Sequence, residues 1–147
     1  MSRRCGALAA LLLLAPAAAE ARPLRVLSLD QCADQYVLAL APEADLALSS
    51  RADDPDSWMR HSTQGRLRVR PTLEAAIGFQ PDVVVRYWGG EPRLLAALEK
   101  RGTRVLNIDD ATDMAGVREN LRSVSHGLGQ EARGAALIAH MDRRLAQ

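Results

Sequence analysis

Side chains that often carry out catalysis are present in this sequence, but few have a spacing that would bring them together. Cys32 lies between Asp30 and Asp34, with no histidine close to it in the sequence. A thiol acts as a nucleophile when a nearby base or positive charge stabilises its thiolate. Because Cys32 falls in the first turn of a predicted amphipathic helix, we expect a small residue packed under the edge of a sheet.

The other candidates for catalysis or metal binding are His61, His126, His140, the group Asp53, Asp54 and Asp56, and the group Asp109, Asp110 and Asp113. The histidines share no metal-ligand spacing, and we expect His126 in the last turn of a helix. The first carboxylate group could bind a cation with His61, but a solvated loop is the simpler interpretation. The second group is typical of residues that cap a helix start. With no nucleotide-binding or nucleophile-elbow motif present, we predict no catalytic residue, no metal site and no cofactor.

An unusual use of aromatic residues is the strongest local signal. The chain has only two Trp, two Tyr and one Phe, and Tyr87 and Trp88 stand together after a run of valines and before Gly89 and Gly90. Ligands of parallel sheets bind beyond the carboxyl ends of the strands, and glycine lets a ligand approach the backbone. We predict that at least one of the two aromatics contacts a ligand. Strand alternation would send the two side chains to opposite faces, one packed under the adjacent helix and the other toward the open end. The alternative is that both are core residues.

Strand-like and helix-like segments alternate along the chain. The predicted strands are 24–29, 46–49, 82–87 and 104–108, with a minor strand at 67–69. The predicted helices are 31–40, 73–79, one that begins near Pro92 and ends at Gly102, one over 114–128, and one from 130 onward, with Asp30 and Thr72 as caps. The polar segment 50–66 is predicted to be a long loop. This alternation predicts an α/β fold with a parallel sheet flanked by helices.

The first 21 residues have the pattern of a secretory signal peptide. Arg3 and Arg4 precede an apolar run at 7–15 that is too short to span a bilayer, and Ala19-Glu20-Ala21 is an A-x-A cleavage site. We predict cleavage after Ala21 and a location in the bacterial periplasm. Cleavage would bring the formal net charge from +1 to zero, and no basic excess indicates a nucleic-acid partner.

Three segments of the chain resemble the class III solute-binding proteins of bacterial ABC importers, which serve iron–siderophore complexes, haem and vitamin B12. The segments are RVLSLDQCADQYVLAL, TLEAAIGFQPDVVVRYWGG and LLAALEKRGTRVLNIDD. The family hallmark L-E-x-x-I/V-x-x-x-P-D-V/L-V is matched by Leu73, Glu74, Ile77 and residues 81–84. The aromatic residue followed by Gly-Gly resembles the B12-binding branch in particular.

The resemblance implies two α/β lobes joined by one long, rigid helix, and this chain matches the first lobe. We therefore expect the N-terminal lobe at 22–129 and the start of the interlobe helix at 130–147, with the second lobe absent. The helix would project from the lobe with an uncovered apolar stripe, formed by Gly134, Leu137, Ile138, Met141 and Leu145.

The resemblance also implies ligand and permease contacts. We expect Tyr87, with Trp88 as second choice, and Arg51 to touch the ligand, and Asp30 and Gln31 to border the same cleft. Arg51 lies in a loop where the B12-binding branch carries aromatics. A guanidinium there favours a ferric siderophore over cobalamin, because it can bind carboxylate or catecholate oxygens in a bidentate manner.

Glu74 would pair with an arginine of an inner-membrane permease, as the glutamate at this motif position does in the family. A hypothesis of another class is a secreted α/β enzyme whose active site lies in the same crevice. The signal peptide and the lack of a nucleophile or cofactor motif favour the binding protein.

Overall fold

The computed structural model describes residues 22–147, so the predicted signal peptide lies outside the described residues. The described chain forms one five-stranded sheet with strand order β3-β2-β1-β4-β5, and all neighbouring strands are parallel. The strands are β1 (Arg25–Ser28), β2 (Asp45–Ser49), β3 (Leu67–Val69), β4 (Val83–Arg86) and β5 (Arg104–Asn107). Parallel pairing of Val26 with Val83 confirms the predicted sheet.

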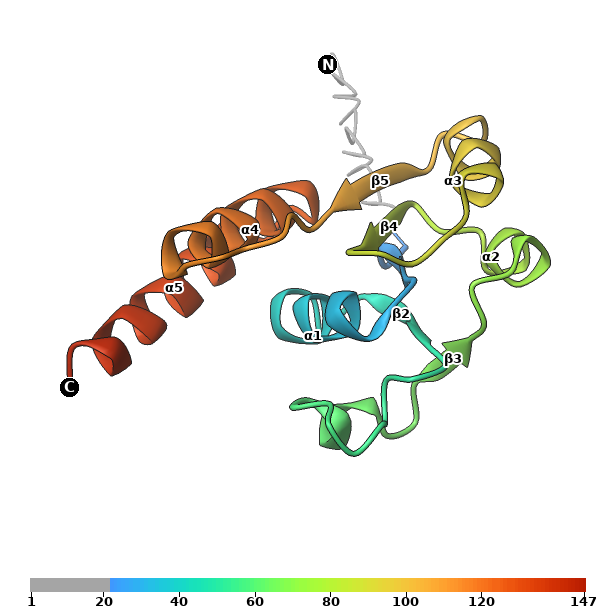
Figure 1. Ribbon diagram of the computed structural model, residues 1–147. Coiled ribbons are helices and arrows are strands. Elements are labelled where there is room, and N and C mark those ends of the chain that lie inside the picture. Colours follow the sequence, from blue (N-terminus) through green and yellow to red (C-terminus); the bar gives the residue numbers. More distant parts are fainter. Residues whose placement is uncertain (1–21) are drawn as a thin grey trace, which may run out of the picture.

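Helices cover both faces of the sheet (Figure 1). They are α1 (Gln31–Leu40), α2 (Leu73–Phe79), α3 (Pro92–Glu99), α4 (Met114–Gly127) and α5 (Glu131–Leu145), with a 3-10 turn η1 (Arg60–Thr63). Val83 and Val85 pack with residues of α1 and α4, whereas Val84 between them packs with residues of α2 and α3. Strand side chains alternate between the two faces, so a strand that is covered on both faces is apolar throughout.

The helix starts follow the predicted caps. The backbone N–H of Ala33 donates to Oδ1 of Asp30 at 2.9 Å, and Thr72 and Asp113 cap α2 and α4 in the same way. A capping oxygen satisfies one of the N–H groups that the first turn leaves without a partner. The segment 50–66 is a loop apart from η1, and His126 lies in the last turn of α4, both as predicted.

Two expectations were wrong. Cys32 is exposed and not packed under the sheet, because Ala33, Asp34 and Val37 form the face of α1 that meets the core. The strand β4 ends at Arg86, one residue before the predicted end, so Tyr87 and Trp88 lie in the following loop. Their surroundings still differ as expected, because Tyr87 packs against the core and Trp88 is exposed.

The apolar stripe of α5 is only partly uncovered, because α5 packs along α4 (Figure 1). Gly134 is buried against Ser125, where a Cβ atom would lie 2.2 Å from Oγ of Ser125. Leu137 packs against the core, while Leu145 is 57% exposed. An ion pair of 2.6 Å between Arg118 and Asp142 further joins the two helices. Within residues 22–147 no helix combines the length and the apolar character that a membrane crossing requires.

Candidate functional site

The carboxyl ends of the parallel strands meet at one edge of the sheet, and the predicted ligand residues lie there. Asp30 and Gln31 follow β1, Arg51 follows β2, and Tyr87 and Trp88 follow β4. The fold therefore brings together residues that are up to 58 positions apart in sequence. This is the edge at which α/β proteins bind ligands.

Asp30 is the structural centre of this edge. Its side chain caps α1, and its second oxygen, Oδ2, accepts the backbone N–H groups of Tyr87, Trp88 and Gly89 at 2.7, 3.2 and 3.0 Å. Asp30 is 1% exposed, so its carboxylate is balanced by these N–H groups in place of water. Asp30 therefore holds the loop after β4 in position and offers no surface to a ligand.

The segment 86–90 is fixed from several sides. Nε of Arg86 donates to the carbonyl oxygen of Gly89 at 2.5 Å, and Nη1 of Arg86 donates to Oδ1 of Asn107 at 2.8 Å. Gly89 lies so close to the backbone of Leu29 that a Cβ atom would be 2.4 Å from its carbonyl oxygen. Only glycine permits this approach, and the segment is consequently a rigid platform.

The two aromatics on this platform differ in their surroundings. Tyr87 is half-buried against the core, and its hydroxyl donates to Oδ1 of Asp110 at 3.0 Å. The hydrogen bond to Asp110 and the charge of that carboxylate raise the pKa of Tyr87, so the phenol stays protonated. Trp88 is 57% exposed and is the aromatic that presents its face to solvent.

Several side chains of the segment 50–66 make contacts at the surface. Nε of Arg51 lies 2.7 Å from Oδ2 of Asp54, and Nε2 of Gln31 donates to Oδ1 of Asp56 at 3.0 Å. Asp53 pairs with Arg68 of β3. The guanidinium of Arg51 thus has a carboxylate partner at the same edge.

The same loop carries a residue that sequence reasoning missed. Trp58 is 90% exposed. Its neighbours anchor the loop, because Ser57 is buried and Met59 packs against the core. A large apolar side chain in a polar loop was the available signal. Both tryptophans of the chain are therefore exposed in loops that follow the carboxyl ends of strands.

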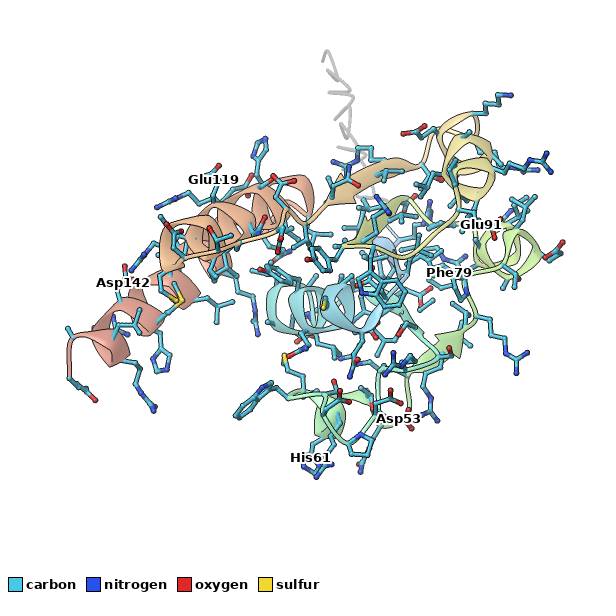
Figure 2. All side chains as sticks on the ribbon, in the orientation of Figure 1. Asp53, His61, Phe79, Glu91, Glu119 and Asp142 are labelled. Carbon is cyan, nitrogen blue, oxygen red and sulfur yellow. The ribbon has the colours of Figure 1, made fainter. Side chains whose placement is uncertain are left out.

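Two further predictions concern Glu74 and metal binding. Glu74 is exposed in the first turn of α2, as expected. Among residues 22–147, no cluster of three or more His, Cys, Asp or Glu side chains could hold a metal ion. Asp53 and His61 both project from the 50–66 segment, well away from Glu119 on α4 (Figure 2).

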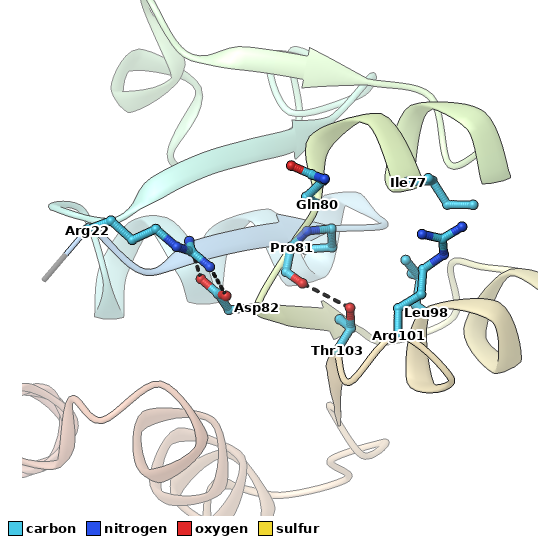
Figure 3. A pocket seen from close by; sticks show the side chains of 8 residues that line it. All are labelled: Arg22, Ile77, Gln80, Pro81, Asp82, Leu98, Arg101 and Thr103. Carbon is cyan, nitrogen blue, oxygen red and sulfur yellow. Dashed lines mark hydrogen bonds and ion pairs between the residues drawn. The ribbon is translucent and has the colours of Figure 1, made fainter.

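A cavity of about 340 Å³ lies at the opposite, amino edge of the sheet (Figure 3). Arg22 donates to both carboxylate oxygens of Asp82 at 2.9 and 2.6 Å, and Oγ1 of Thr103 donates to the carbonyl oxygen of Pro81 at 2.9 Å. The Arg22 guanidinium lowers the pKa of Asp82. The pair of Arg22 and Asp82 joins the start of the described chain to the residue before β4.

Comparison with known proteins gives matches among solved structures alone. No protein-family model and no curated protein matches the chain. A periplasmic heme-binding protein from Pseudomonas aeruginosa matches with a TM-score of 0.65 and 23% identity, over 84% of this chain and 45% of that chain. A possible iron-binding protein, a periplasmic solute-binding protein from Staphylococcus epidermidis, matches with a TM-score of 0.69 and 16% identity, over 84% and 49%.

The periplasmic vitamin B12-binding protein of Vibrio cholerae matches with a TM-score of 0.62 and 22% identity, over 84% of this chain and 49% of that chain. The chain has the fold of one lobe of a two-lobe binding protein. It spans about half the length of each of these structures.

Proposed function

We propose that this chain is the ligand-binding lobe of a periplasmic substrate-binding protein, which captures a metal chelate and delivers it to an ABC permease in the inner membrane. The observation that carries the proposal is a pair of exposed tryptophans, Trp58 and Trp88, in loops at the carboxyl edge of a parallel sheet. Tyr87 lies at the same edge, and its hydroxyl donates to Asp110. The named structures of the same fold bind heme, iron or B12, and the predicted signal peptide at 1–21 supports the periplasm.

The state of Cys32 supports binding over catalysis. Although Cys32 is exposed, partial loss of water around its thiol and the nearby carboxylates of Asp30 and Asp34 raise the pKa of the thiol, so it is protonated at neutral pH and a poor nucleophile. The carboxylates beside it, Asp30 and Asp34, are buried and occupied by hydrogen bonds. A secreted α/β enzyme would need a reactive group at this edge.

Two ligand chemistries fit the edge. A ferric siderophore fits Arg51, whose side chain is 54% exposed and whose surface partner Asp54 can be exchanged for a ligand anion. A tetrapyrrole such as cobalamin or haem is the second candidate, because Trp58 and Trp88 offer flat apolar faces that match a macrocycle. The two candidates make opposite predictions for the arginine and the tryptophans.

Intrinsic fluorescence of the purified chain tests the proposal, since both tryptophans report on this edge. The probes are a ferric tricatecholate, a ferric trihydroxamate, haemin and cyanocobalamin, with calorimetry as a check on absorption by the probes. We expect one probe to bind saturably. If it is a siderophore, Arg51→Ala should weaken binding strongly; if it is a tetrapyrrole, Trp58→Ala and Trp88→Ala should do so.

Arg101→Ala is the matched control, because Arg101 is an exposed arginine beside the amino-edge cavity. It should leave binding unchanged. The proposal fails if none of the four probes binds saturably to the chain, or if Arg101→Ala weakens binding as much as the edge variants do.

Permease docking is proposed for Glu74. The side chain is exposed on α2, where a carboxylate can meet an arginine of a partner. Glu74→Arg should abolish uptake of the chelate by cells that carry the importer and leave ligand affinity intact. Glu99→Arg makes the same charge change at the end of α3 and should leave uptake unaffected. Loss of affinity in Glu74→Arg, with normal docking, would overturn this assignment.

A further inference from the structure

Helix α1 carries two buried carboxylates one turn apart, and each binds a different loop of the candidate site. Asp30, at the N-cap, is 1% exposed, and Asp34, in the first turn, is 0% exposed. Buried carboxylates are costly unless hydrogen bonds replace the lost water, so their partners identify what they hold.

Asp30 holds the loop that follows β4. Its Oδ2 atom accepts the N–H groups of Tyr87, Trp88 and Gly89, while Oδ1 accepts the N–H of Ala33. All four donors are backbone groups that cannot reverse their polarity. The position of Trp88 is therefore tied to α1 through its own amide.

Asp34 holds the start of the 50–66 segment. Its Oδ1 atom accepts the N–H of Ser49 at 2.8 Å, and its Oδ2 atom accepts the hydroxyl of Ser49 at 2.6 Å. Oγ of Ser49 in turn accepts the N–H of Arg51 at 3.2 Å. This chain of hydrogen bonds leads from α1 to the first residues of the loop that carries Trp58.

We propose that Asp30 and Asp34 are positioning residues that set the two ligand-facing loops relative to each other, with α1 as their common support. The inference rests on the proposed function, because the loops matter only if they bind a ligand. One helix turn fixes the start of each loop, so the backbone at Trp88 and at Arg51 is in place before a ligand arrives. Such preorganisation lowers the ordering cost of binding.

The two positions differ in what could replace the carboxylate. At position 30 an amide has one acceptor for four N–H donors, so Asp30→Asn must turn its NH₂ group toward backbone N–H groups. At position 34 an amide oxygen can accept the Ser49 N–H while its NH₂ donates to Oγ of Ser49, whose hydroxyl is free to rotate. Asparagine should therefore rescue the second position and fail at the first.

Residue-resolved amide hydrogen exchange of the full chain by NMR tests this without any ligand. In Asp30→Asn, exchange of the Tyr87, Trp88 and Gly89 amides should rise by at least about tenfold, while Ser49 is unchanged. In Asp34→Ala the exchange rate of the Ser49 amide should rise, and the rates of the other three amides should not change. Asp34→Asn should restore the slow exchange of the Ser49 amide. Asp109→Asn, an exposed carboxylate at the same edge, should change neither set.

Asp30→Ser is the second variant, to be used if Asp30→Asn does not fold. Serine keeps the N-cap of α1 but is too short to reach the loop amides. Exchange that rises uniformly over the chain in the Asp30 and Asp34 variants, or stays unchanged at the named amides, would overturn the proposal. So would local loosening that leaves the affinity for the probe bound by the wild type unchanged. If no probe binds the wild type, the proposed function fails, while the exchange pattern still decides whether these carboxylates hold the loops.

Discussion

Two loops at the same edge of the sheet are held by different kinds of interaction. The 86–90 segment is fixed by backbone N–H groups that donate to a buried carboxylate and by the close approach of Gly89 to Leu29. The 50–66 segment is anchored at its start by Asp34 and by local backbone hydrogen bonds, but the ion pairs of its side chains, such as Arg51–Asp54, are exposed.

We therefore expect the 86–90 segment to keep one conformation and the side chains of the 50–66 segment to adapt to a ligand. Buried hydrogen bonds to a charged group are strong and are lost at a high cost, whereas exposed ion pairs contribute little and exchange easily with water or a ligand. A ligand would thus meet Trp88 already in place, and would rearrange the side chains around Arg51. Three predictions test this contrast, in order of decreasing effect.

The largest effect is expected at the tightest backbone contact. Gly89→Ala would place Cβ 2.4 Å from the carbonyl oxygen of Leu29, and backbone must move to relieve this overlap. We expect the free energy of unfolding to fall by about 2–3 kcal/mol, as measured by urea denaturation.

Gly65→Ala is the matched substitution in the other loop. No atom lies within 4 Å of its Cβ position, but φ is +73°, so left-handed strain alone should cost about 1 kcal/mol. Equal losses in the two variants would contradict the distinction between a tightly packed loop and an open one.

A smaller, pH-dependent effect is expected for the anchor of the 50–66 segment. Burial raises the pKa of Asp34, although its hydrogen bonds from Ser49 oppose the shift. The folded state therefore holds the proton more tightly than the unfolded state. The contribution of Asp34 to stability is present below its unfolded pKa of about 3.9 and is lost as pH rises through the folded pKa.

Asp34→Asn removes this titration and keeps both contacts with Ser49. Its free energy of unfolding should differ from that of the wild type by less than about 1 kcal/mol at the lowest pH, and the variant should gain relative stability as pH rises toward neutrality. Urea denaturation at a series of pH values measures this, with Asp109→Asn as the control for loss of one exposed carboxylate. A difference that does not change with pH would show that the pKa of Asp34 is the same in the folded and unfolded states.

The smallest effect is expected for the exposed pair of Arg51 and Asp54. A double-mutant cycle with Arg51→Ala and Asp54→Ala should give a coupling free energy of about 0.5 kcal/mol or less, which decreases with added salt. The side chains are 54% and 30% exposed, so water screens the pair. A coupling free energy above about 1.5 kcal/mol would mean that the 50–66 segment is held as firmly as the 86–90 segment.

Local patterns in the sequence were enough to predict the secondary structure. The helices α1 and α2 have the predicted bounds, and the caps Asp30 and Thr72 are observed, because a cap acts on amides two or three residues away. Valine-rich runs indicated buried parallel strands, since both faces of such strands are covered. The exposed position of Glu74 was expected from the family motif that this residue matches, and it is observed.

Most of the site was decided by the tertiary structure. The sequence identified Tyr87 and Trp88 as binding candidates, but the strand ends one residue earlier than predicted, and the loop conformation depends on a carboxylate 57 to 59 positions away. Asp30 could be predicted as a cap, whereas its three further N–H partners could not, because they are brought to it only when β1 and β4 pair.

The side-chain partners of the candidate residues were also outside the reach of sequence reasoning. Asp110 next to the Tyr87 hydroxyl and Asn107 next to Arg86 come from β5 and the segment after it, on the far side of β4. The sequence by itself determined an α/β chain with its polar and aromatic residues at the carboxyl ends of strands, because periodicity and capping are local. The tertiary structure alone decided which of these residues are buried supports and which are exposed to a ligand, because burial and long-range hydrogen bonds exist only after the strands have paired.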